Sequence, residues 1–258
     1  MLDDYVLFGM RVAVVGGTGQ VGRHVVDALA RTSHEPVTIA RSVGIDVISG
    51  EGLDAVLAGV ASVVDVTNTP AQEPDATRAF FGTITKRLLD AEQRAGVAHH
   101  LVLSIVCVDR VRSNAHYEGK RLQEKLVRSG PIPFTILRAT QFHEFAGMVA
   151  SWTRRDDVAV VPPLLVQPVA ASEVGDILAE LAVGPPSGDI VELGGPQTED
   201  LAEMARRTFA AEGEHVRVDA TWTDGPLSDE MAGDVLLPGP HACLGTITFD
   251  DWLTHSSA

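Results

Sequence analysis

With 258 residues, 45% of them hydrophobic, the chain is large enough to bury a substantial core, which excludes an intrinsically disordered protein. The formal net charge of -15, from 35 acidic and 20 basic side chains, disfavours direct binding of nucleic acid, whose phosphates require clustered lysine and arginine. No apolar run reaches the length of a membrane span, and the two cysteines, Cys107 and Cys243, have neither disulfide nor metal-site spacing, so we expect a cytoplasmic protein without a metal ion.

A strand, a glycine cluster and a helix follow one another between Arg11 and Leu29. Val12 to Val15 are apolar without alternation, as in a strand covered on both faces. Glycine permits a tight turn, close approach of a pyrophosphate to the main chain, and close packing of helix on strand, while the amides at the helix N-terminus attract the anion. The pattern therefore predicts dinucleotide binding by Gly16, Thr18, Gly19, Gln20, Val21 and Gly22.

The second expected strand, 36–40, ends on a basic residue. Arg41 and Ser42 follow it directly. In dinucleotide-binding folds an acidic residue at this place accepts hydrogen bonds from the adenosine ribose, whereas arginine pairs with a 2′-phosphate. These residues favour NADP(H). A solvated surface arginine would give the same pattern, and Asp46 follows five positions later, so NAD(H) stays possible.

Two further segments are expected beside the cofactor. Residues 45–48 are predicted to form a third strand that places Asp46 near the adenine ring, before a helix at 51–57. The next strand, 62–66, runs into Thr67, Asn68 and Thr69. Ligands bind outside the carboxyl ends of parallel strands, so this loop should border the cofactor, although an ordinary turn uses the same residue types.

Helices and strands continue to alternate as far as residue 138. Helices are expected at 75–95 and 115–128, and strands at 101–106, with Cys107 as inert packing at its end, and at 134–137. His99 and His100 are expected at an exposed strand entrance, and the second helix is expected to bury Ala115, Gly119, Leu122 and Leu126. The alternation predicts an α/β fold of Rossmann type, a doubly wound parallel sheet.

Residues 1–9 are read as an N-terminal extension, 10–150 as the NAD(P)-binding core, and 151–258 as a smaller mixed lobe that packs as one unit with the core and covers a substrate. Within that lobe we expect a helix at 172–182, a strand at 190–193 and a helix with Thr198 as N-cap. Glycine and proline recur from 222 to 240, before a final ordered segment at 248–253.

Taken together, these residues resemble the short-chain dehydrogenase/reductase superfamily, in particular its atypical, NmrA-like branch of NAD(P)-binding proteins. The resemblance covers nearly the whole chain. It rests on GGTGQVG at 16–22, on Arg41 and Ser42, on the VLSIV strand with Ser104, and on the segment from His116 to Phe145.

Standard members of the superfamily combine a serine, a tyrosine and a lysine, with the tyrosine four positions before the lysine. The resemblance assigns Ser104 and Lys120, both also cofactor contacts, but His116 occupies the tyrosine position. Tyr117 lies three positions before Lys120, and both spacings place side chains together on a helix. Either His116 supplies the substrate proton, or Tyr117 does, or neither acts and Lys120 only holds the nicotinamide ribose. In the first two cases Ser104 would bind the developing oxyanion.

Just past the sixth expected strand, the carboxyl-end rule predicts a substrate-lining segment. The two aromatic side chains there could stack on a planar acceptor such as a quinone, and the histidine is another possible proton source; ordinary packing between the lobes would use the same residues. The residues are Gln141, Phe142, His143 and Phe145.

These features predict an NADPH-dependent oxidoreductase that reduces a small organic carbonyl or a quinone. A quinone needs less help from a proton donor than an isolated ketone, which suits the missing tyrosine. Two alternatives stay open: an NADP(H)-binding redox sensor that signals to a protein partner without turnover, and a non-redox enzyme of the epimerase or cyclase type on the same fold. The pattern does not set the oligomeric state.

Overall fold

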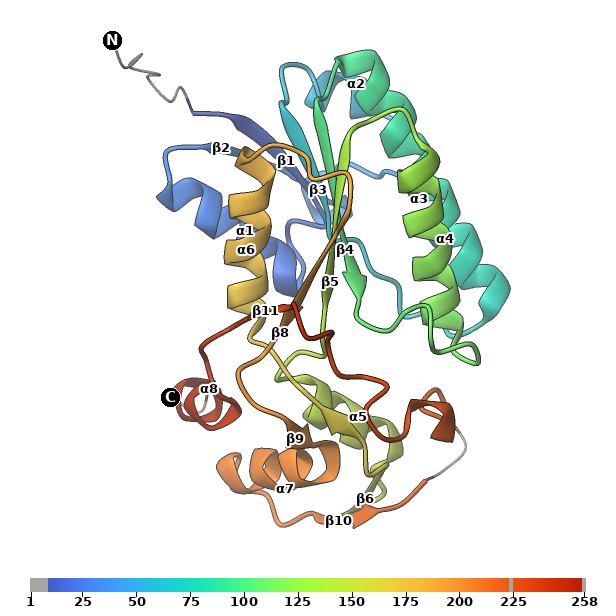
Figure 1. Cartoon of the computed structure of the whole chain (residues 1–258), viewed down its shortest axis with the longest axis vertical. Coiled ribbons are helices and arrows are strands. Elements are labelled where there is room, and N and C mark those ends of the chain that lie inside the picture. The colour runs from blue at the N-terminus through green and yellow to red at the C-terminus, as the bar shows by residue number, and fades with distance from the viewer. Residues whose placement is uncertain (1–8, 223–224, 257–258) are drawn as a thin grey trace.

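The computed structural model describes residues 9–222 and 225–256 (Figure 1). Residues 1–8, most of the expected N-terminal extension, lie outside this part. Among the described residues, the largest sheet has seven strands in the order β11-β8-β5-β4-β3-β1-β2, and every neighbouring pair is parallel. The predicted α/β fold of Rossmann type is confirmed.

The strands of this sheet are short and mostly buried. The central strands β1 and β3 have water on neither face, which explains why Val12 to Val15 are apolar without alternation. The bounds are β1 (Arg11–Val15), β2 (Glu35–Ile39), β3 (Ser62–Asp65), β4 (His99–Ile105), β5 (Phe134–Ala139), β8 (Ile190–Gly194) and β11 (Cys243–Leu244).

Helices cover the sheet on both faces (Figure 1). On one face α1 (Gln20–Arg31) packs against α6 (Ala171–Val183), so closely that a Cβ on Gly175 would lie 2.5 Å from His24 Cβ. On the other face lie α2 (Leu53–Val56), α3 (Pro74–Ala95) and α4 (Ala115–Ser129). The α3–α4 contact is equally close, because a Cβ on Gly119 would lie 2.5 Å from Thr77 Cγ2. Glycine is thus required where helices meet.

A smaller lobe lies at one end of the sheet (Figure 1). Its helices, α5, α7 and α8, share one apolar core with residues of the loop after β4. Its small sheets pair β6 with β10 in parallel and β7 with β9 antiparallel. The bounds are α5 (Phe145–Thr153), β6 (Val158–Val161), β7 (Leu165–Val166), β9 (Glu199–Asp200), α7 (Leu201–Ala211), β10 (Arg217–Ala220), the 3-10 turn η2 (Asp229–Met231) and α8 (Phe249–Ser256).

The lobe is not simply residues 151–258. The helix α6 and the strands β8 and β11 fall within that range but belong to the main sheet and its helical cover. A parallel strand can be added only by a long crossover, so the chain leaves the core after β5, builds part of the lobe, and returns.

Residues 45–48 do not form the expected strand. They lie in a turn, because Asp46 Oδ1 accepts from Ile48 N at 2.8 Å and Asp46 O accepts from Gly50 N at 3.1 Å. Val47 is buried in the core, and Ile45 packs against it half-buried. Cys107 likewise lies in a turn after β4, at φ +66°, rather than in the strand.

Three other expectations are wrong for reasons of side-chain pairing. His99 and His100 are buried inside β4, where they bond Thr135 Oγ1 and the Glu92 carboxylate, each at 2.9 Å. The side of α4 that is buried is offset by about one residue from the expected side, and it carries polar residues. The N-cap of α7 is Asp200, whose side chain accepts from Glu203 N, and not Thr198.

The rotated stripe of α4 is the most consequential of these differences. Of the four residues expected to be buried, only Gly119 is, whereas Lys120, Gln123 and Glu124 face the sheet. The polar groups are tolerated there because each has a hydrogen-bond partner on the sheet or on a neighbouring residue of the helix.

No described helix has both the length and the apolar character needed to cross a membrane.

Candidate functional site

The turn between β1 and α1 is shaped for close approach to the main chain. Gly16 has φ +84°, in the left-handed region, and its N–H donates to Ile39 O at 2.8 Å. A Cβ on Gly22 would lie 2.1 Å from Gly16 O, so a side chain there would collide with the turn. Gly19 is the N-cap of α1 and supplies no capping side chain to the first-turn amides. Such amides are what a pyrophosphate requires, so these residues fit a dinucleotide.

The residues expected at the adenosine end begin beside this turn. Arg41 and Ser42 open the 3-10 turn η1 (Arg41–Val43), and Ser42 Oγ donates to Thr18 Oγ1 at 3.0 Å. Arg41 is exposed. The Asp46 carboxylate is instead engaged within its own turn, through the bond to Ile48 N. Arg41 is therefore the better placed of the two charged residues to meet a ligand that lies in the glycine turn.

The loop after β3 lies against the same turn. A Cβ on Gly16 would be 3.2 Å from Val66 O and 3.4 Å from Thr67 N. Asp65 Oδ1 fixes this loop by accepting from Thr67 N at 2.9 Å and from Thr67 Oγ1 at 2.7 Å, and Asn68 Oδ1 accepts from Thr69 N at 2.8 Å. The structure thus brings Thr67, after β3, and Ser42, after β2, against the glycine turn, while cofactor contact by the expected residues stays a prediction.

Lys120 is buried between α4 and the sheet, and its ammonium already has three protein acceptors. Nζ donates to Leu103 O at 2.8 Å, to Gln123 Oε1 at 2.9 Å and to Thr67 O at 3.4 Å. The ammonium also lies 4.6 Å from the centre of the Phe81 ring. Burial lowers the pKa of Lys120 to about 8, against the opposing effect of nearby carboxylates. The bond to Thr67 O is the longest of the three, and a ribose contact by Lys120 stays a prediction.

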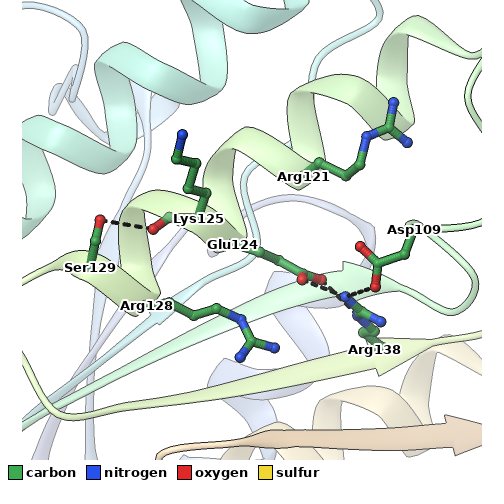
Figure 2. Close-up of a pocket in the computed structure, with 7 residues that line it drawn as sticks. All are labelled: Asp109, Arg121, Glu124, Lys125, Arg128, Ser129 and Arg138. Carbon is green, nitrogen blue, oxygen red and sulfur yellow. Dashed lines mark hydrogen bonds and ion pairs between the residues drawn. The ribbon is translucent and has the colours of Figure 1, made fainter.

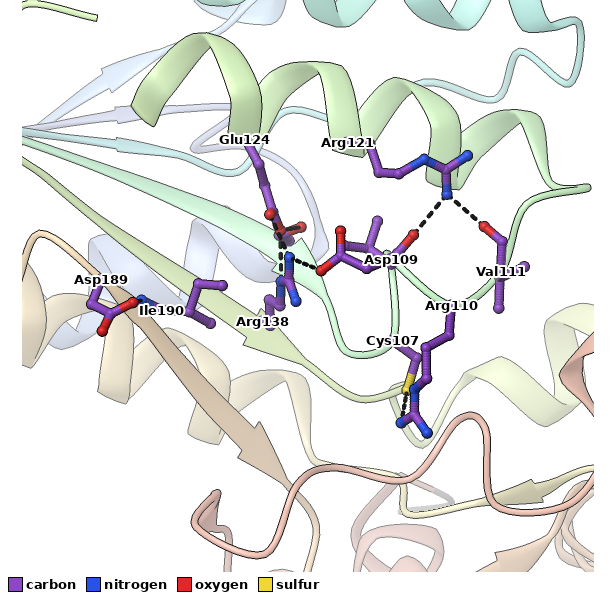
Figure 3. Close-up of polar contacts among 11 residues, drawn as sticks. Cys107, Asp109, Arg110, Val111, Arg121, Glu124, Arg138, Asp189 and Ile190 are labelled. Carbon is purple, nitrogen blue, oxygen red and sulfur yellow. Dashed lines mark hydrogen bonds and ion pairs between the residues drawn. The ribbon is translucent and has the colours of Figure 1, made fainter. Parts of the chain in front are cut away.

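Ser104 does not have its expected role. Its Oγ donates to Glu124 Oε1 at 2.6 Å in the buried layer between the sheet and α4. Glu124 also accepts from Arg138 Nε at 2.8 Å and from Arg138 Nη2 at 2.6 Å, and Asp109 Oδ2 lies 2.7 Å from the same Nη2 (Figure 3). The pairing of β4 with β5 puts Ser104 directly beside Arg138. Because its hydrogen is donated to a buried carboxylate, the serine is a structural residue here and not the predicted donor to an oxyanion.

Neither candidate proton donor has the environment of an acid. His116 is half-buried and packs edge-on to Phe81, with ring centres 5.6 Å apart. Burial, aided by the charge of Lys120, lowers the pKa of His116 to about 4, so its imidazole is neutral near pH 7. Tyr117 lies in the core shared with the lobe, and burial raises the pKa of its phenol well above the usual value, although a hydrogen bond with Gln141 opposes this.

The expected substrate segment divides into two parts. His143 is wrong as a substrate-lining residue: its ring is buried between Phe249 and Trp252, at centre distances of 5.7 and 5.6 Å, and its Nε2 lies 3.1 Å from Ile247 O. Phe142 and Phe145 are half-buried, one beside the core and one beside the lobe. Gln141 is buried, and its Oε1 has no hydrogen-bond partner among the described residues. Substrate contact by these three residues stays a prediction.

Several residues of this region were missed in the sequence. Gln123 Nε2 donates to Asp65 Oδ2 at 2.8 Å, which links the Lys120 site to the end of β3. Glu124 and Arg138 form the buried ion pair. The available signal was a charged residue inside an apolar strand, as at Asp65 and Arg138, because such a residue needs a buried partner. Among the described residues, no group of three or more histidine, cysteine or acidic side chains could hold a metal ion.

Comparison with known proteins places this site in a family. A family model described as NAD(P)H-binding matches residues 16–157, which include the glycine turn, the loop after β3 and all of α4. The chain belongs to this NAD(P)H-binding family. Its cofactor is therefore of the class that the glycine turn predicts, as the resemblance to NAD(P)-binding proteins implies.

Individual relatives of this NAD(P)H-binding chain are distant. The photosystem II assembly factor Ycf39 of Synechocystis is 26% identical over a match that covers 52% of the chain but only 45% of that protein. A short-chain dehydrogenase/reductase superfamily protein of Agrobacterium tumefaciens, with bound NAD, has a TM-score of 0.70 at 18% identity over 96% of both chains. An NADPH-dependent quinone oxidoreductase of Escherichia coli, complexed with NADPH, has a TM-score of 0.67 at 16% identity. The match covers 96% of this chain and 100% of that chain. These structures share the fold.

Proposed function

We propose that the protein is an NADPH-dependent oxidoreductase that reduces a small organic acceptor, with a quinone favoured over an isolated carbonyl. Bound in the glycine turn, the nicotinamide cofactor supplies hydride. The chain's own residues bind and orient it: the first-turn amides of α1 hold the pyrophosphate, Arg41 and Ser42 pair with the 2′-phosphate, and Lys120 holds the ribose nearest the acceptor.

The observation that carries this proposal is the engagement of the groups that would deliver a proton. Lys120 has three acceptors, Ser104 donates to Glu124, and His116 is neutral near pH 7. A ketone needs proton transfer to its developing alkoxide, whereas a quinone spreads the added charge over its ring and takes protons from water. The likeness to a quinone oxidoreductase of known fold supports the same acceptor class.

The preference for NADPH rests on Arg41. The side chain is exposed at the end of β2, beside a serine that already contacts the glycine turn. Arginine forms two parallel hydrogen bonds to a phosphate and so distinguishes a 2′-phosphate from a hydroxyl. NAD(H) would bind more weakly through the same amides.

The test is a fluorescence titration of the purified protein with NADPH and NADH, followed by absorbance of the reduced nicotinamide in the presence of small quinones and aldehydes. Selective binding of NADPH and its quinone-dependent oxidation would support the proposal. Binding of NADPH and NADP⁺ with no oxidation by any acceptor would favour the redox sensor. Conversion of a substrate with no net change in NADPH would favour an epimerase or cyclase.

A further inference from the structure

A surface cavity of about 450 Å³ opens beside α4 (Figure 2), away from the glycine turn. Its lining has four basic and two acidic side chains, a formal excess of two positive charges in a chain whose net charge is -15. We call it the α4 cavity. Its lining residues are Asp109, Arg121, Glu124, Lys125, Arg128, Ser129 and Arg138.

The floor of the α4 cavity is a fixed arginine. Arg138 and Glu124 bond through two nitrogen–oxygen contacts, and their side chains are only 9% and 6% exposed. One carboxylate therefore already compensates the guanidinium charge and holds its plane. Rigid support of this kind is what a recognition arginine needs.

A second carboxylate approaches the same guanidinium from the solvent side. Asp109 Oδ2 lies 2.7 Å from Arg138 Nη2, but the Asp109 side chain is 62% exposed and belongs to the turn after β4. Because Asp109 is the exposed partner, its carboxylate returns to water when it leaves Arg138, and the guanidinium keeps its two bonds to Glu124. Asp109 thus occupies an anion position on Arg138 that a dissolved anion could take at small cost.

Of the other basic side chains that line the cavity, Lys125 points away from Arg138 (Figure 2). Arg128 leaves α4 on the same side as Glu124, above the strand that carries Arg138 (Figure 2). Among the described residues, neither Arg128 nor Lys125 forms an ion pair. Arg121 uses Nη1 for Val108 O and Val111 O, which directs its guanidinium along the same turn (Figure 3).

We propose that the α4 cavity binds a small molecule with a phosphate or carboxylate group, and that this group replaces Asp109 on Arg138 and also pairs with Arg128. Arginine recognises both oxyanions by the same planar geometry. A volume of about 450 Å³ is within the range of small-molecule sites. The site is distinct from the glycine turn, so the proposal does not depend on the proposed reductase activity.

The experiment is a calorimetric titration of the cofactor-free protein with inorganic phosphate, repeated with succinate to separate the two oxyanion sources. Arg128→Gln should lower the affinity for the anion about tenfold or more, which is the effect of losing one charged hydrogen bond. Asp109→Asn should strengthen binding several-fold, because the competing carboxylate is gone while the side-chain volume is kept. Both changes are at exposed positions, and circular dichroism verifies that the variants fold.

A matched arginine variant makes the assignment specific. Arg155→Gln removes one exposed positive charge in the lobe, far from any residue assigned to the cofactor. Unchanged binding in Arg155→Gln, with the expected changes at 128 and 109, would support the α4 cavity. The proposal is overturned if neither anion binds, if Arg128→Gln leaves binding unchanged, which would place the anion elsewhere, if Arg155→Gln acts as strongly as Arg128→Gln, or if Asp109→Asn leaves the affinity unchanged.

Discussion

The glycine turn and helix α4 lie in one sheet-based core but differ in what they leave available. At the glycine turn the shape is made by backbone: a left-handed Gly16, a Cβ-free Gly22 and an N-cap that contributes no side chain. Between α4 and the sheet the polar side chains already have partners: Lys120 bonds Gln123, Gln123 bonds Asp65, and Glu124 bonds Arg138. The first region is prepared for a ligand, whereas the side chains between α4 and the sheet hold the fold and leave only the outer edge of Arg138 to a proposed anion.

This difference separates binding from catalysis in the molecule. Cofactor binding needs amides and space, which the turn supplies without any partner. Proton transfer needs side chains whose hydrogens are free and whose pKa values lie near the working pH. Lys120 has a pKa of about 8, but its ammonium is engaged by three acceptors. Ser104 of β4 donates to Glu124, and burial shifts the pKa of Tyr117 upward.

The largest expected effect comes from the buried ion pair of the α4 region. Arg138→Met leaves the Glu124 carboxylate buried without its main partner, so the free energy of unfolding should fall by about 3–5 kcal/mol in a urea titration. The double variant Arg138→Met/Glu124→Leu removes both charges and should recover most of this loss. A single variant as stable as the unchanged protein would show that the pair is not a structural element.

The glycine turn is tested by Gly22→Val. Its side chain must displace Gly16 O, which its Cβ would approach to 2.1 Å, so we expect a loss of about 3 kcal/mol in stability and the loss of NADPH binding in a fluorescence titration. Gly184→Ala is the control, because a Cβ there would meet no atom closer than 3.6 Å. Normal NADPH affinity in Gly22→Val would contradict the view that the backbone shape of the glycine turn is required for cofactor binding.

The pH dependence of stability reports on Lys120. Desolvation lowers the pKa of its folded-state ammonium to about 8, against an ordinary lysine value of 10.5, so the unfolded chain binds the proton more tightly. Below pH 8 the cost of burying the charge is complete, and above about 10.5 it has vanished. Stability should therefore rise by about 3 kcal/mol across this window relative to Lys120→Met. Parallel pH profiles for the two proteins in urea titrations would contradict the buried ammonium.

The smallest effect is expected at the adenosine end. Arg41→Ala should weaken NADPH about tenfold, or about 1.4 kcal/mol, and leave NADH unchanged, because only NADPH has the 2′-phosphate. Arg155→Ala, an exposed arginine in the lobe, is the matched control. An equal loss for both cofactors would mean that Arg41 acts through general charge and does not select the phosphate.

The two regions also differ in how far they could be predicted. The glycine turn was found because its requirements are local: a strand, three glycines and a helix within about twenty residues. Ser104 and Arg138 lie on two strands and meet the same residue, Glu124, on the helix between them, and pattern alone does not pair side chains across three elements. The same limit explains the misplaced stripe of α4, where hydrophobic spacing suggested Leu122 and Leu126 but buried bonds selected Gln123 and Glu124.

His143 shows the same limit of sequence-based prediction, for partners that lie much further along the chain. Its local context, just after β5, indicated a place beside the substrate. Its actual partners, Ile247, Phe249 and Trp252, belong to the last described segment, and the bond to Ile247 spans 104 positions. No periodicity around residue 143 contains that information.

The position of α8 has a consequence for how the molecule is completed during synthesis. Chains leave the ribosome from the N-terminus, and the sheet up to β5 can assemble before the last hundred residues exist. The His143 ring is exposed to water until α8 packs against it. Glu173 of α6 accepts from the amides of Thr246 and Ile247, which fixes the segment before α8. During synthesis, therefore, the contacts that enclose His143 can form only after the chain has been made as far as α8.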